Sequence, residues 1–428
     1  MDFRLWSLPV LALLGCGIFA LSLQELYAYR GIVPISFEVG NAVLAITWLG
    51  LAATIYPREM RLPSDLFLVF YVIVGFLWGA LLWPATGLLS IDGGVLMMVL
   101  LYLPALAVVL LRRAAASAAK EFFLPIMAFR REHLHVPLLV LLAIAGVVAF
   151  GAVGDGGFGI DSAYDRRLGG RDALSGQMAG YALNMAMNGG APLLAFIAGW
   201  RRKPMLLFLA LCFAVFAFWL LGLKSLFVYV PALAAAGFAL RLPWMARQFP
   251  LLIVLGLIVA YGIVCLEVSD GSYSLLADYV VRRVSMVQPQ VQSYYLDAWL
   301  SLQFGAKLVG APVGNYSDWT FMIGESYLNN PATNANTNAF FYALLKSGLI
   351  GYAMAIIVVA LFMVVLDAFF VRTGMPEFFA IAGLFGVLIS EQAYTTALLS
   401  SGVFLCLALV TLFSYPSRRS NTELDWNT

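Results

Sequence analysis

The residues with the clearest chemical potential are basic side chains that lie between apolar stretches in the middle of the chain. Arg167 and Arg171 are four residues apart, and Arg282 is followed directly by Arg283. An arginine carries a planar fork of donors that pairs with two phosphate oxygens at once, and it stays charged at physiological pH. In a helix, Arg167 and Arg171 would lie one turn apart on one face. We therefore predict a pyrophosphate site at these arginines, to which Lys224, in a short turn between two apolar stretches, would add positive charge.

Local ion pairing is the alternative interpretation of the same residues. Three aspartates lie within six residues of Arg167, and Asp278 precedes Arg282 by four residues. An exposed helical pair of this kind contributes only about 0.3 to 0.5 kcal/mol. Lys224 could likewise extend its ammonium group to the membrane interface and bind no ligand. The sequence leaves both interpretations open.

A transfer reaction at such a site also needs a proton acceptor. His133 and His135 are the only histidines, and they lie in a different, basic segment, so we expect a carboxylate. A general base has to come within about 2.6 to 3.2 Å of the proton that it removes. We favour Asp297 and Glu325, because they share a segment with Arg282. The full set of candidates comprises Asp165, Asp278, Asp297, Asp318, Glu325 and Glu391.

Aromatic residues are dense in the segment that holds these carboxylates. Their rings combine apolar faces with polar tips, which suits stacking on sugars. An aromatic belt at a membrane interface would account for part of the set. The residues are Tyr273, Tyr279, Tyr294, Tyr295, Trp299, Tyr316, Trp319, Tyr327 and Tyr342.

The composition indicates which elements must position these side chains. Of the 428 residues, 62% are hydrophobic and 11% are charged, whereas a water-soluble chain carries about 25% charged residues to cover its surface. One crossing of the hydrocarbon core takes about 20 residues. We therefore expect an all-α, polytopic integral membrane protein with about twelve transmembrane helices, forming a single transmembrane domain over residues 1–428. The expected spans are 7–24, 34–56, 66–84, 93–111, 136–154, 181–199, 204–222, 226–240, 249–268, 347–370, 376–391 and 395–413.

Basic residues are distributed unevenly between the two sides of this arrangement. With both termini on one side, the loops of that side hold 16 of the 25 Lys and Arg residues. By the positive-inside rule, both termini are then cytoplasmic. The basic loop 112–135 lies on that side too, and we interpret it as an interfacial helix among anionic head groups. The outer face receives two larger loops, 155–180 and 269–340, and long loops in a compact protein are usually functional.

Two segments should depart from regular spans. Apolar residues recur at spacings of three and four from Leu276 to Leu302, which predicts an amphipathic helix that Pro289 kinks or splits. We expect this helix on the outer membrane surface or over a cavity. The sixth span contains Asn184 and Asn188, followed by Gly189–Gly190, so we expect it to be locally unwound and to line a cavity. Helix–helix hydrogen bonding is the alternative for these polar residues.

Composition also argues against several classes of site. The net charge of +2 is too close to neutral for a polyanion-binding surface, so we expect no nucleic acid partner. All four cysteines lie in apolar stretches, which predicts no disulfide. The two histidines have no neighbouring cysteines, so we expect no metal and no cofactor.

Four short motifs occur in order between residues 160 and 352, and together they resemble a known family. They are Tyr164-Asp165-Arg166-Arg167-Leu168-Gly169-Gly170-Arg171, then Gly222-Leu223-Lys224-Ser225, then Arg282-Arg283 with Pro289 and Tyr294-Tyr295, and finally Asn336-Thr337. With the hydropathy around them, they resemble the Wzy-type O-antigen polymerases, which are oligosaccharide repeat-unit polymerases. Two features differ from the family pattern. Members often carry an acidic residue where this chain has Tyr342, and an arginine-to-glycine spacing described for some members is absent.

The resemblance implies a GT-C-like membrane glycosyltransferase of lipopolysaccharide biosynthesis in the bacterial inner membrane, with its active site facing the periplasm. It would transfer a growing chain from undecaprenyl pyrophosphate to a new lipid-linked repeat unit. Its implied partners are these lipid-linked oligosaccharides, membrane lipids and a chain-length regulator protein. The implied pyrophosphate-binding residues are Arg167, Arg171, Lys224, Arg282 and Arg283; the implied base is Asp297 or Glu325; and the implied sugar-binding residues are Tyr164, Tyr294, Tyr295 and Asn336.

Two other functions fit the same composition. An O-antigen ligase would share the architecture and the lipid donor. The ligase family is similar to enzymes that use a histidine in a large outer loop. This chain has no histidine in its predicted outer loops. A lipid-linked oligosaccharide flippase would need a polar pathway through the spans. Most basic residues lie in loops instead, so we favour the polymerase.

Overall fold

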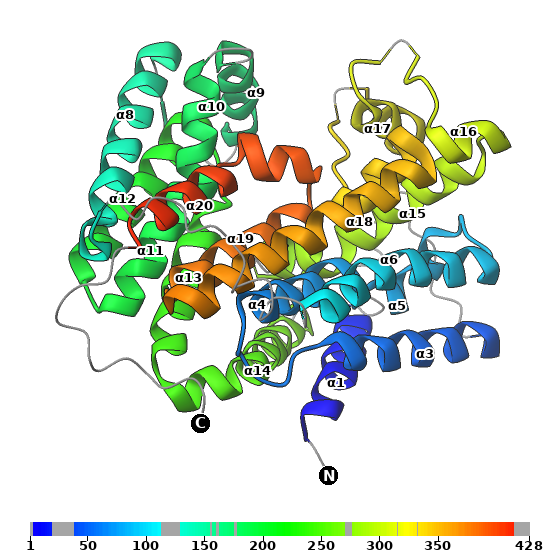
Figure 1. Cartoon of the computed structure of the whole chain (residues 1–428). Coiled ribbons are helices and arrows are strands. Elements are labelled where there is room, and N and C mark those ends of the chain that lie inside the picture. Colours follow the sequence, from blue (N-terminus) through cyan, green and yellow to red (C-terminus); the bar gives the residue numbers. More distant parts are fainter. Residues whose placement is uncertain are drawn as a thin grey trace.

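The computed structural model describes residues 3–18, 38–112, 129–154, 156–159, 162–174, 178–269, 276–314, 316–331 and 333–414. Every regular element in these ranges is a helix (Figure 1). The α-helices are α1 (Phe3–Ile18), α3 (Val39–Ile55), α4 (Pro63–Phe70), α5 (Gly79–Leu82), α6 (Ile91–Leu111), α8 (His135–Val153), α9 (Ala163–Leu174), α10 (Met178–Met185), α11 (Ala191–Arg201), α12 (Pro204–Leu221), α13 (Leu226–Arg241), α14 (Pro243–Ser269), α15 (Gln288–Leu300), α16 (Phe304–Val309), α17 (Trp319–Leu328), α18 (Ala339–Thr373), α19 (Glu377–Ile389) and α20 (Val403–Leu412). Four π-helical segments, η3 (Tyr71–Phe76), η7 (Ala186–Gly190), η8 (Ala277–Val287) and η9 (Thr396–Ser400), and two short 3-10 helices, η4 (Pro84–Thr86) and η6 (Arg131–His133), complete the set.

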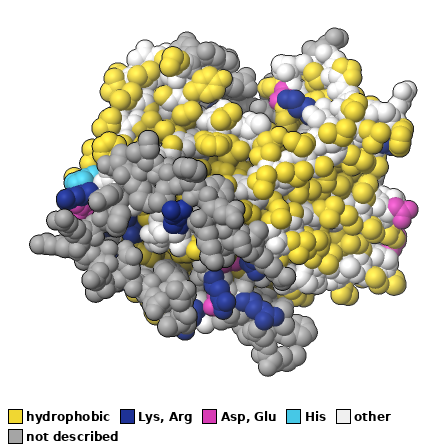
Figure 2. Space-filling model, viewed as in Figure 1, with side chains coloured by type: hydrophobic (Ala, Val, Ile, Leu, Met, Phe, Trp, Pro, Cys, Tyr) yellow, Lys and Arg dark blue, Asp and Glu magenta, His cyan; other side chains and the backbone are white. Residues whose placement is uncertain are grey.

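Seven helical segments in the described ranges are long and apolar enough to cross a membrane. They are Pro63–Leu82, Ile91–Leu111, Arg131–Val153, Met178–Arg201, Pro204–Leu221, Pro243–Glu267 and Ala339–Thr373. The shorter apolar helices α3, α13, α19 and α20 coincide with further predicted spans. The structure thus confirms an all-helical, polytopic membrane protein, while the total of twelve spans stays a prediction. Figure 2 shows a broad hydrophobic surface on this molecule, with Lys and Arg side chains gathered toward the lower left.

The close crossing of α11 and α13 shows how the bundle packs. A Cβ atom on Gly199 would lie 2.0 Å from the carbonyl oxygen of Ala234, and one on Gly237 would lie 2.3 Å from that of Phe196. Backbones can approach this closely only where a helix surface lacks side chains, as is typical of membrane bundles. The same small residues therefore fix α11 against α13.

Carbonyl groups that a helix leaves unsatisfied are paired inside the bundle. Pro104 in α6 has no N–H, so the carbonyl of Leu100 lacks its helical partner. The hydroxyl of Tyr352 in α18 donates to this carbonyl at 2.6 Å, and the hydroxyl of Tyr71 donates to the carbonyl of Leu101 at 2.8 Å. An unsatisfied carbonyl in hydrocarbon is costly, so these bonds hold η3 and α18 against α6.

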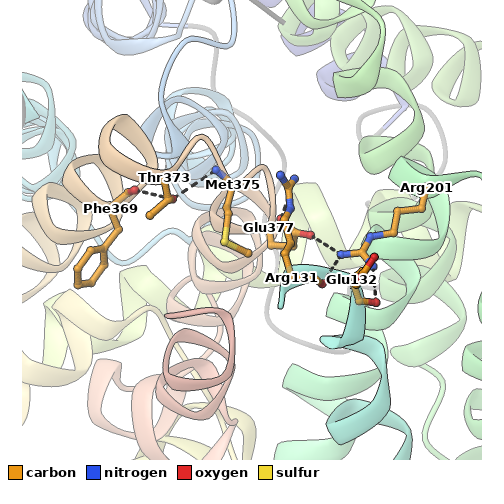
Figure 3. A network of polar contacts seen from close by, with 7 residues as sticks. All are labelled: Arg131, Glu132, Arg201, Phe369, Thr373, Met375 and Glu377. Carbon is orange, nitrogen blue, oxygen red and sulfur yellow. Dashed lines mark hydrogen bonds and ion pairs between the residues drawn. The ribbon is translucent and has the colours of Figure 1, made fainter. Parts of the chain in front are cut away.

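A buried ion-pair network joins three elements at one end of the bundle (Figure 3). Glu377, in the first turn of α19, is 1% exposed, and its carboxylate forms ion pairs of 3.4 Å with Arg131 and with Arg201. Arg201 also donates to the backbone carbonyls of Arg131 and Glu132, at 2.7 and 3.0 Å. The network therefore fastens the start of α8, the end of α11 and the start of α19 together.

Helix α15, part of the second large loop, packs inside the bundle, so the expected place on the outer membrane surface is wrong for it. The alternative place over a cavity stays a prediction. Helix α15 continues directly from η8, with Pro289 in its first turn, so the predicted break is a change from π- to α-helical winding. Every residue from 288 to 296 is buried. The polar side chains here are uncharged, and several are paired: Gln292 Nε2 donates to the carbonyl of Gly75 in η3 at 3.1 Å, and Ser293 Oγ donates to that of Pro289 at 2.9 Å. The Oε1 atoms of Gln288 and Gln292 are buried and accept no hydrogen bond from the described residues.

The sixth predicted span is irregular at the expected place. The π-helix η7 separates α10 from α11, and Asn188 Nδ2 donates to Asn184 Oδ1 at 2.6 Å. A Cβ atom on Gly189 would lie 3.1 Å from the carbonyl oxygen of Gly402, just before α20. The span is irregular at the expected place but remains helical, and Gly189 within it closely contacts the segment before α20. A cavity along this span stays a prediction.

Candidate active site

Asp297 lies in the last turns of α15, where a chain of hydrogen bonds and ring contacts connects α15 with α17. The hydroxyl of Tyr327 in α17 donates to Asp297 Oδ2 at 2.7 Å. The ring of Tyr327 stacks on Tyr294, with centroids 4.9 Å apart and planes at 16°. Gln290 Nε2 in turn donates to the hydroxyl of Tyr294 at 2.7 Å. Asp297 itself is half-buried, so its carboxylate is fixed but still reachable from outside.

Asp318 forms a second pair of the same kind between α17 and α18. Its Oδ1 atom accepts from the backbone N–H of Trp319 at 2.7 Å, which caps α17, and from the hydroxyl of Tyr342 at 2.9 Å. Lys346 Nζ donates to the Tyr342 hydroxyl at 3.3 Å. Asp318 caps the start of α17 and Tyr327 lies in its last turn, so the two pairs lie about 13 Å apart along this helix. We call the two pairs, Asp297–Tyr327 and Asp318–Tyr342, the tyrosine–carboxylate cluster.

Burial and the carboxylates keep the tyrosines of this region protonated. Burial, and next the hydrogen bond to Asp297, raise the pKa of Tyr327 well above its usual value. Burial, and next the charge of Asp318, likewise raise the pKa of Tyr295. Tyr327 is therefore a hydrogen-bond donor at neutral pH, and Asp297 is the acceptor.

Two lysines flank the cluster. Lys307 in α16 lies over the ring of Trp299, with Nζ 5.8 Å from the centroid, and its backbone carbonyl accepts from Trp299 Nε1 at 3.3 Å. Lys346 lies 5.3 Å over the ring of Tyr342. A lysine ammonium group is a compact charge that can bind phosphate oxygens. One lysine therefore contacts Tyr342 of the cluster, and the other lies over Trp299, two residues after Asp297.

A break in α18 lets the segments that carry these two lysines pack against each other. Ser347 and Gly348 leave the helical conformation, and Gly348 has φ +63°, which favours glycine. A Cβ atom on Gly348 would lie 2.3 Å from the carbonyl carbon of Leu308, and one on Gly310 would lie 2.1 Å from the carbonyl oxygen of Lys346. The two glycines therefore allow α16, which carries Lys307, to lie directly against the break.

Glu325, the other predicted base, and the predicted sugar-binding residues differ in how exposed they are. Glu325 is exposed on α17, and a hydrogen bond to it raises the pKa of Tyr316. Tyr295 is fully buried, and its hydroxyl donates to the carbonyl of Ala335 at 3.2 Å. Asn336 is exposed. Tyr294 is 4% exposed, so neither it nor Tyr295 offers an open ring face, whereas the side chain of Tyr164 lies outside the described residues.

The predicted pyrophosphate residues do not form one clamp around Asp297. Arg282 lies in η8, fifteen residues before Asp297 on one continuous helix, which separates them by about 20 Å. Arg167 is exposed on α9, which Figure 1 shows beside α8 and α10, apart from α16 and α17. Lys224 is half-buried in the turn after α12. The side chains of Arg171 and Arg283 lie outside the described residues.

Three residues of this site, Asp318, Lys307 and Lys346, stand out only weakly in the sequence. Asp318 was one of six candidate carboxylates, and the signal for it is its position before Trp319, where an aspartate caps a helix. Lys346 follows Tyr342 by four residues, so helical spacing is the signal for their contact. Lys307 has no comparable signal, because its place depends on the packing of α16 against the break in α18. Within the described ranges, no three His, Cys, Asp or Glu side chains come close enough together to hold a metal ion.

Comparisons with known proteins identify no similar protein. The chain was compared with protein-family models, with curated proteins and with solved structures, and none of the three comparisons found a match.

Proposed function

We propose that the chain is a membrane-embedded glycosyltransferase that polymerises oligosaccharide repeat units carried on undecaprenyl pyrophosphate. The observation that supports this most is the tyrosine–carboxylate cluster, in which a tyrosine hydroxyl fixes each of two half-buried carboxylates in a hydrophobic helical protein. Lys307 and Lys346 beside it supply cations for a phosphorylated substrate. The order of the four sequence motifs favours a polymerase over other transferases.

In the proposed reaction, a sugar hydroxyl of the new repeat unit attacks the anomeric carbon of the growing chain. The new carbon–oxygen bond forms as the bond to the pyrophosphate oxygen breaks, and undecaprenyl pyrophosphate leaves with the electron pair. The carboxylate takes the proton of the attacking hydroxyl. Fixed cations near the leaving group offset its developing negative charge.

Asp297 is the proposed base. The Tyr327 hydroxyl donates to Oδ2 of Asp297. Its Oδ1 atom accepts no hydrogen bond from the described residues, so it can accept one from the substrate hydroxyl. Asp318 accepts both of its hydrogen bonds at Oδ1, and its role in this proposal is to position the Tyr342 hydroxyl. Family members often carry an acid where this chain has Tyr342, and here Asp318 supplies a carboxylate 2.9 Å from that hydroxyl.

The same proposal places the chain in the bacterial inner membrane, with both termini in the cytoplasm and the cluster at the periplasmic end. Helix α18 leads from Lys346 beside Tyr342 to Arg372 near its other end, so the cluster and Arg372 would lie on opposite sides of the membrane. The gathering of Lys and Arg on one part of the surface also agrees with the positive-inside rule (Figure 2).

Carboxylate variants test the proposal. Purified protein in liposomes would receive lipid-linked repeat units, and glycan length would be measured. We expect Asp297→Asn to slow extension by about 100-fold or more, because general-base catalysis contributes about that much. Asp318→Asn should cost roughly tenfold, because an amide oxygen accepts the same two hydrogen bonds without the negative charge that strengthens them. Asp92→Asn, at an exposed carboxylate in the first turn of α6, is the matched control. Normal glycan lengths from Asp297→Asn would refute the assignment of the base.

A further inference from the structure

An apolar groove runs between α8 and α12, apart from the helices of the tyrosine–carboxylate cluster (Figure 1). Its volume is about 500 Å³, which is typical of a ligand site. Its walls include Leu139, Ala143 and Phe150 of α8 and Leu209 and Phe216 of α12. From Leu139 to Phe150 the groove follows roughly 16 Å of helix, which is about half of the 30 Å hydrocarbon core of a bilayer. The groove therefore has the depth of one membrane leaflet.

One end of the groove lies where α8 and α12 both begin. Arg201, at the end of α11, donates to the backbone carbonyls of Arg131 and Glu132, just before α8, at 2.7 and 3.0 Å. Helix α12 begins three residues after Arg201. Leu139 is the fifth residue of α8 and Leu209 is the sixth residue of α12. The groove therefore starts about one turn inside both helices.

The other end of the groove is aromatic. The ring of Trp219 lies 6.0 Å from that of Phe150 and 6.0 Å from that of Phe216, and both phenylalanines line the groove. The N–H of Gly157, four residues after the end of α8, donates to the carbonyl of Trp219 at 2.8 Å. The ends of α8 and α12 thus lie together, as their starts do, so the two helices run in the same direction.

Basic side chains lie at the start of the groove. Lys203 directly precedes α12, is exposed and forms no ion pair within the described ranges. His135, the first residue of α8, lies one turn before Leu139 on the same face and within electrostatic reach of Lys203. Arg202, whose guanidinium lies 5.5 Å over the ring of Phe238 in α13, adds positive charge beside Lys203. The positive ends of both helix dipoles lie here as well. The start of the groove therefore attracts an anion.

The acidic groups of this region are engaged by other cations. Glu132 forms an ion pair of 3.5 Å with Arg130, and Glu377 forms pairs of 3.4 Å with Arg131 and with Arg201 (Figure 3). These pairs already place three arginines against two glutamates, so the basic residues before α12 add to an excess of positive charge. Figure 2 shows His side chains beside Lys and Arg side chains at the left edge of the molecule, below a hydrophobic surface.

We propose that this groove binds one acyl chain of an anionic diacyl phospholipid, whose phosphate contacts Lys203 and His135. Because the groove has the depth of one leaflet, a phospholipid with its chain there has its phosphate where α8 and α12 begin. A lysine ammonium group binds phosphate oxygens, and an imidazole N–H can donate to them. A zwitterionic lipid would bring a positive group to the same cations, so the charge favours an anionic head group. In the orientation proposed above, the lipid belongs to the cytoplasmic leaflet.

Photo-crosslinking in nanodiscs of phosphatidylcholine tests this site. The probe is phosphatidylglycerol with a diazirine at the end of one acyl chain, and mass spectrometry identifies the labelled peptides. We expect labelling of α8 and α12 around Phe150 and Phe216, at the aromatic end of the groove. Phosphatidylcholine with the same diazirine chain should label these peptides about tenfold less, because its head group carries no net charge for the cations to attract. Equal labelling by the two probes in the unaltered protein would overturn the inference.

Matched variants locate the chain and the phosphate. Ala143→Trp fills the groove and should lower labelling by the phosphatidylglycerol probe about tenfold, whereas Ile144→Trp, exposed on the same helix outside the groove, should leave it unchanged. Lys203→Gln should reduce the preference for phosphatidylglycerol about fivefold. Arg61→Gln removes an exposed arginine before α4 and should not change it.

Unchanged labelling in Ala143→Trp, or an unchanged preference in Lys203→Gln, would contradict the proposed site. Because labelling is measured without glycan extension, its failure would leave the proposed function standing. Labelling as expected in a protein that joins no sugars would contradict only the proposed function.

Discussion

At the scale of single residues, tyrosine hydroxyls determine how the carboxylates can act. Tyr327 donates to one oxygen of Asp297, and Tyr342 donates to Asp318. Because burial and the carboxylate both raise the pKa of Tyr327, its hydroxyl remains a donor at neutral pH. A donor fixed in this way restricts the rotation of the carboxylate and directs its second oxygen toward a substrate.

Removing that hydroxyl should impair the reaction without removing the carboxylate. We expect Tyr327→Phe to lower kcat of glycan extension roughly tenfold, the typical cost of losing one hydrogen bond to a charged group. KM for the lipid-linked repeat unit should change little, since the hydroxyl contacts Asp297 and not the substrate. Tyr316→Phe, which removes the hydroxyl beside the exposed Glu325, is the control and should extend glycans normally. A greater loss in Tyr316→Phe would favour Glu325 as the base.

At the scale of elements, ion pairs and breaks in helices determine how several helices pack against one another. The break at Ser347–Gly348 lets α16 lie against α18. At another part of the bundle, Glu377 binds Arg131 and Arg201 from two other helical segments (Figure 3). A buried carboxylate between two arginines balances their charge, so its loss leaves cations in a poorly solvated place.

This network should therefore matter for stability. We expect Glu377→Gln to lower the free energy of unfolding by about 3 kcal/mol, within the range for breaking a buried ion pair. The midpoint of thermal unfolding in detergent measures the effect. Glu59→Gln breaks the exposed pair with Arg61 and should cost less than about 1 kcal/mol. Equal midpoints for the two variants would show that the network contributes nothing measurable.

At the scale of the whole molecule, the sequence largely predicts the helical frame, whereas it does not predict the pairing within the tyrosine–carboxylate cluster. Apolar runs such as Ile91–Leu111 are long enough to predict helices from composition alone. The apolar stripe from Leu276 to Leu302 predicts one buried face, whereas in α15 every residue from 288 to 296 is buried, partly because Gln292 bonds to the distant carbonyl of Gly75. The contact between Tyr342 and Asp318 joins residues 24 positions apart across an irregular segment. No local pattern encodes such a contact.

The central claim is that this membrane protein joins sugars and does not merely move them. The most direct measurement follows purified protein in sealed liposomes with lipid-linked repeat units, and records glycan length together with released undecaprenyl pyrophosphate. The account predicts a ladder of longer glycans, with one undecaprenyl pyrophosphate released for each repeat unit joined. Repeat units that cross the bilayer unchanged, with no pyrophosphate released, would contradict it.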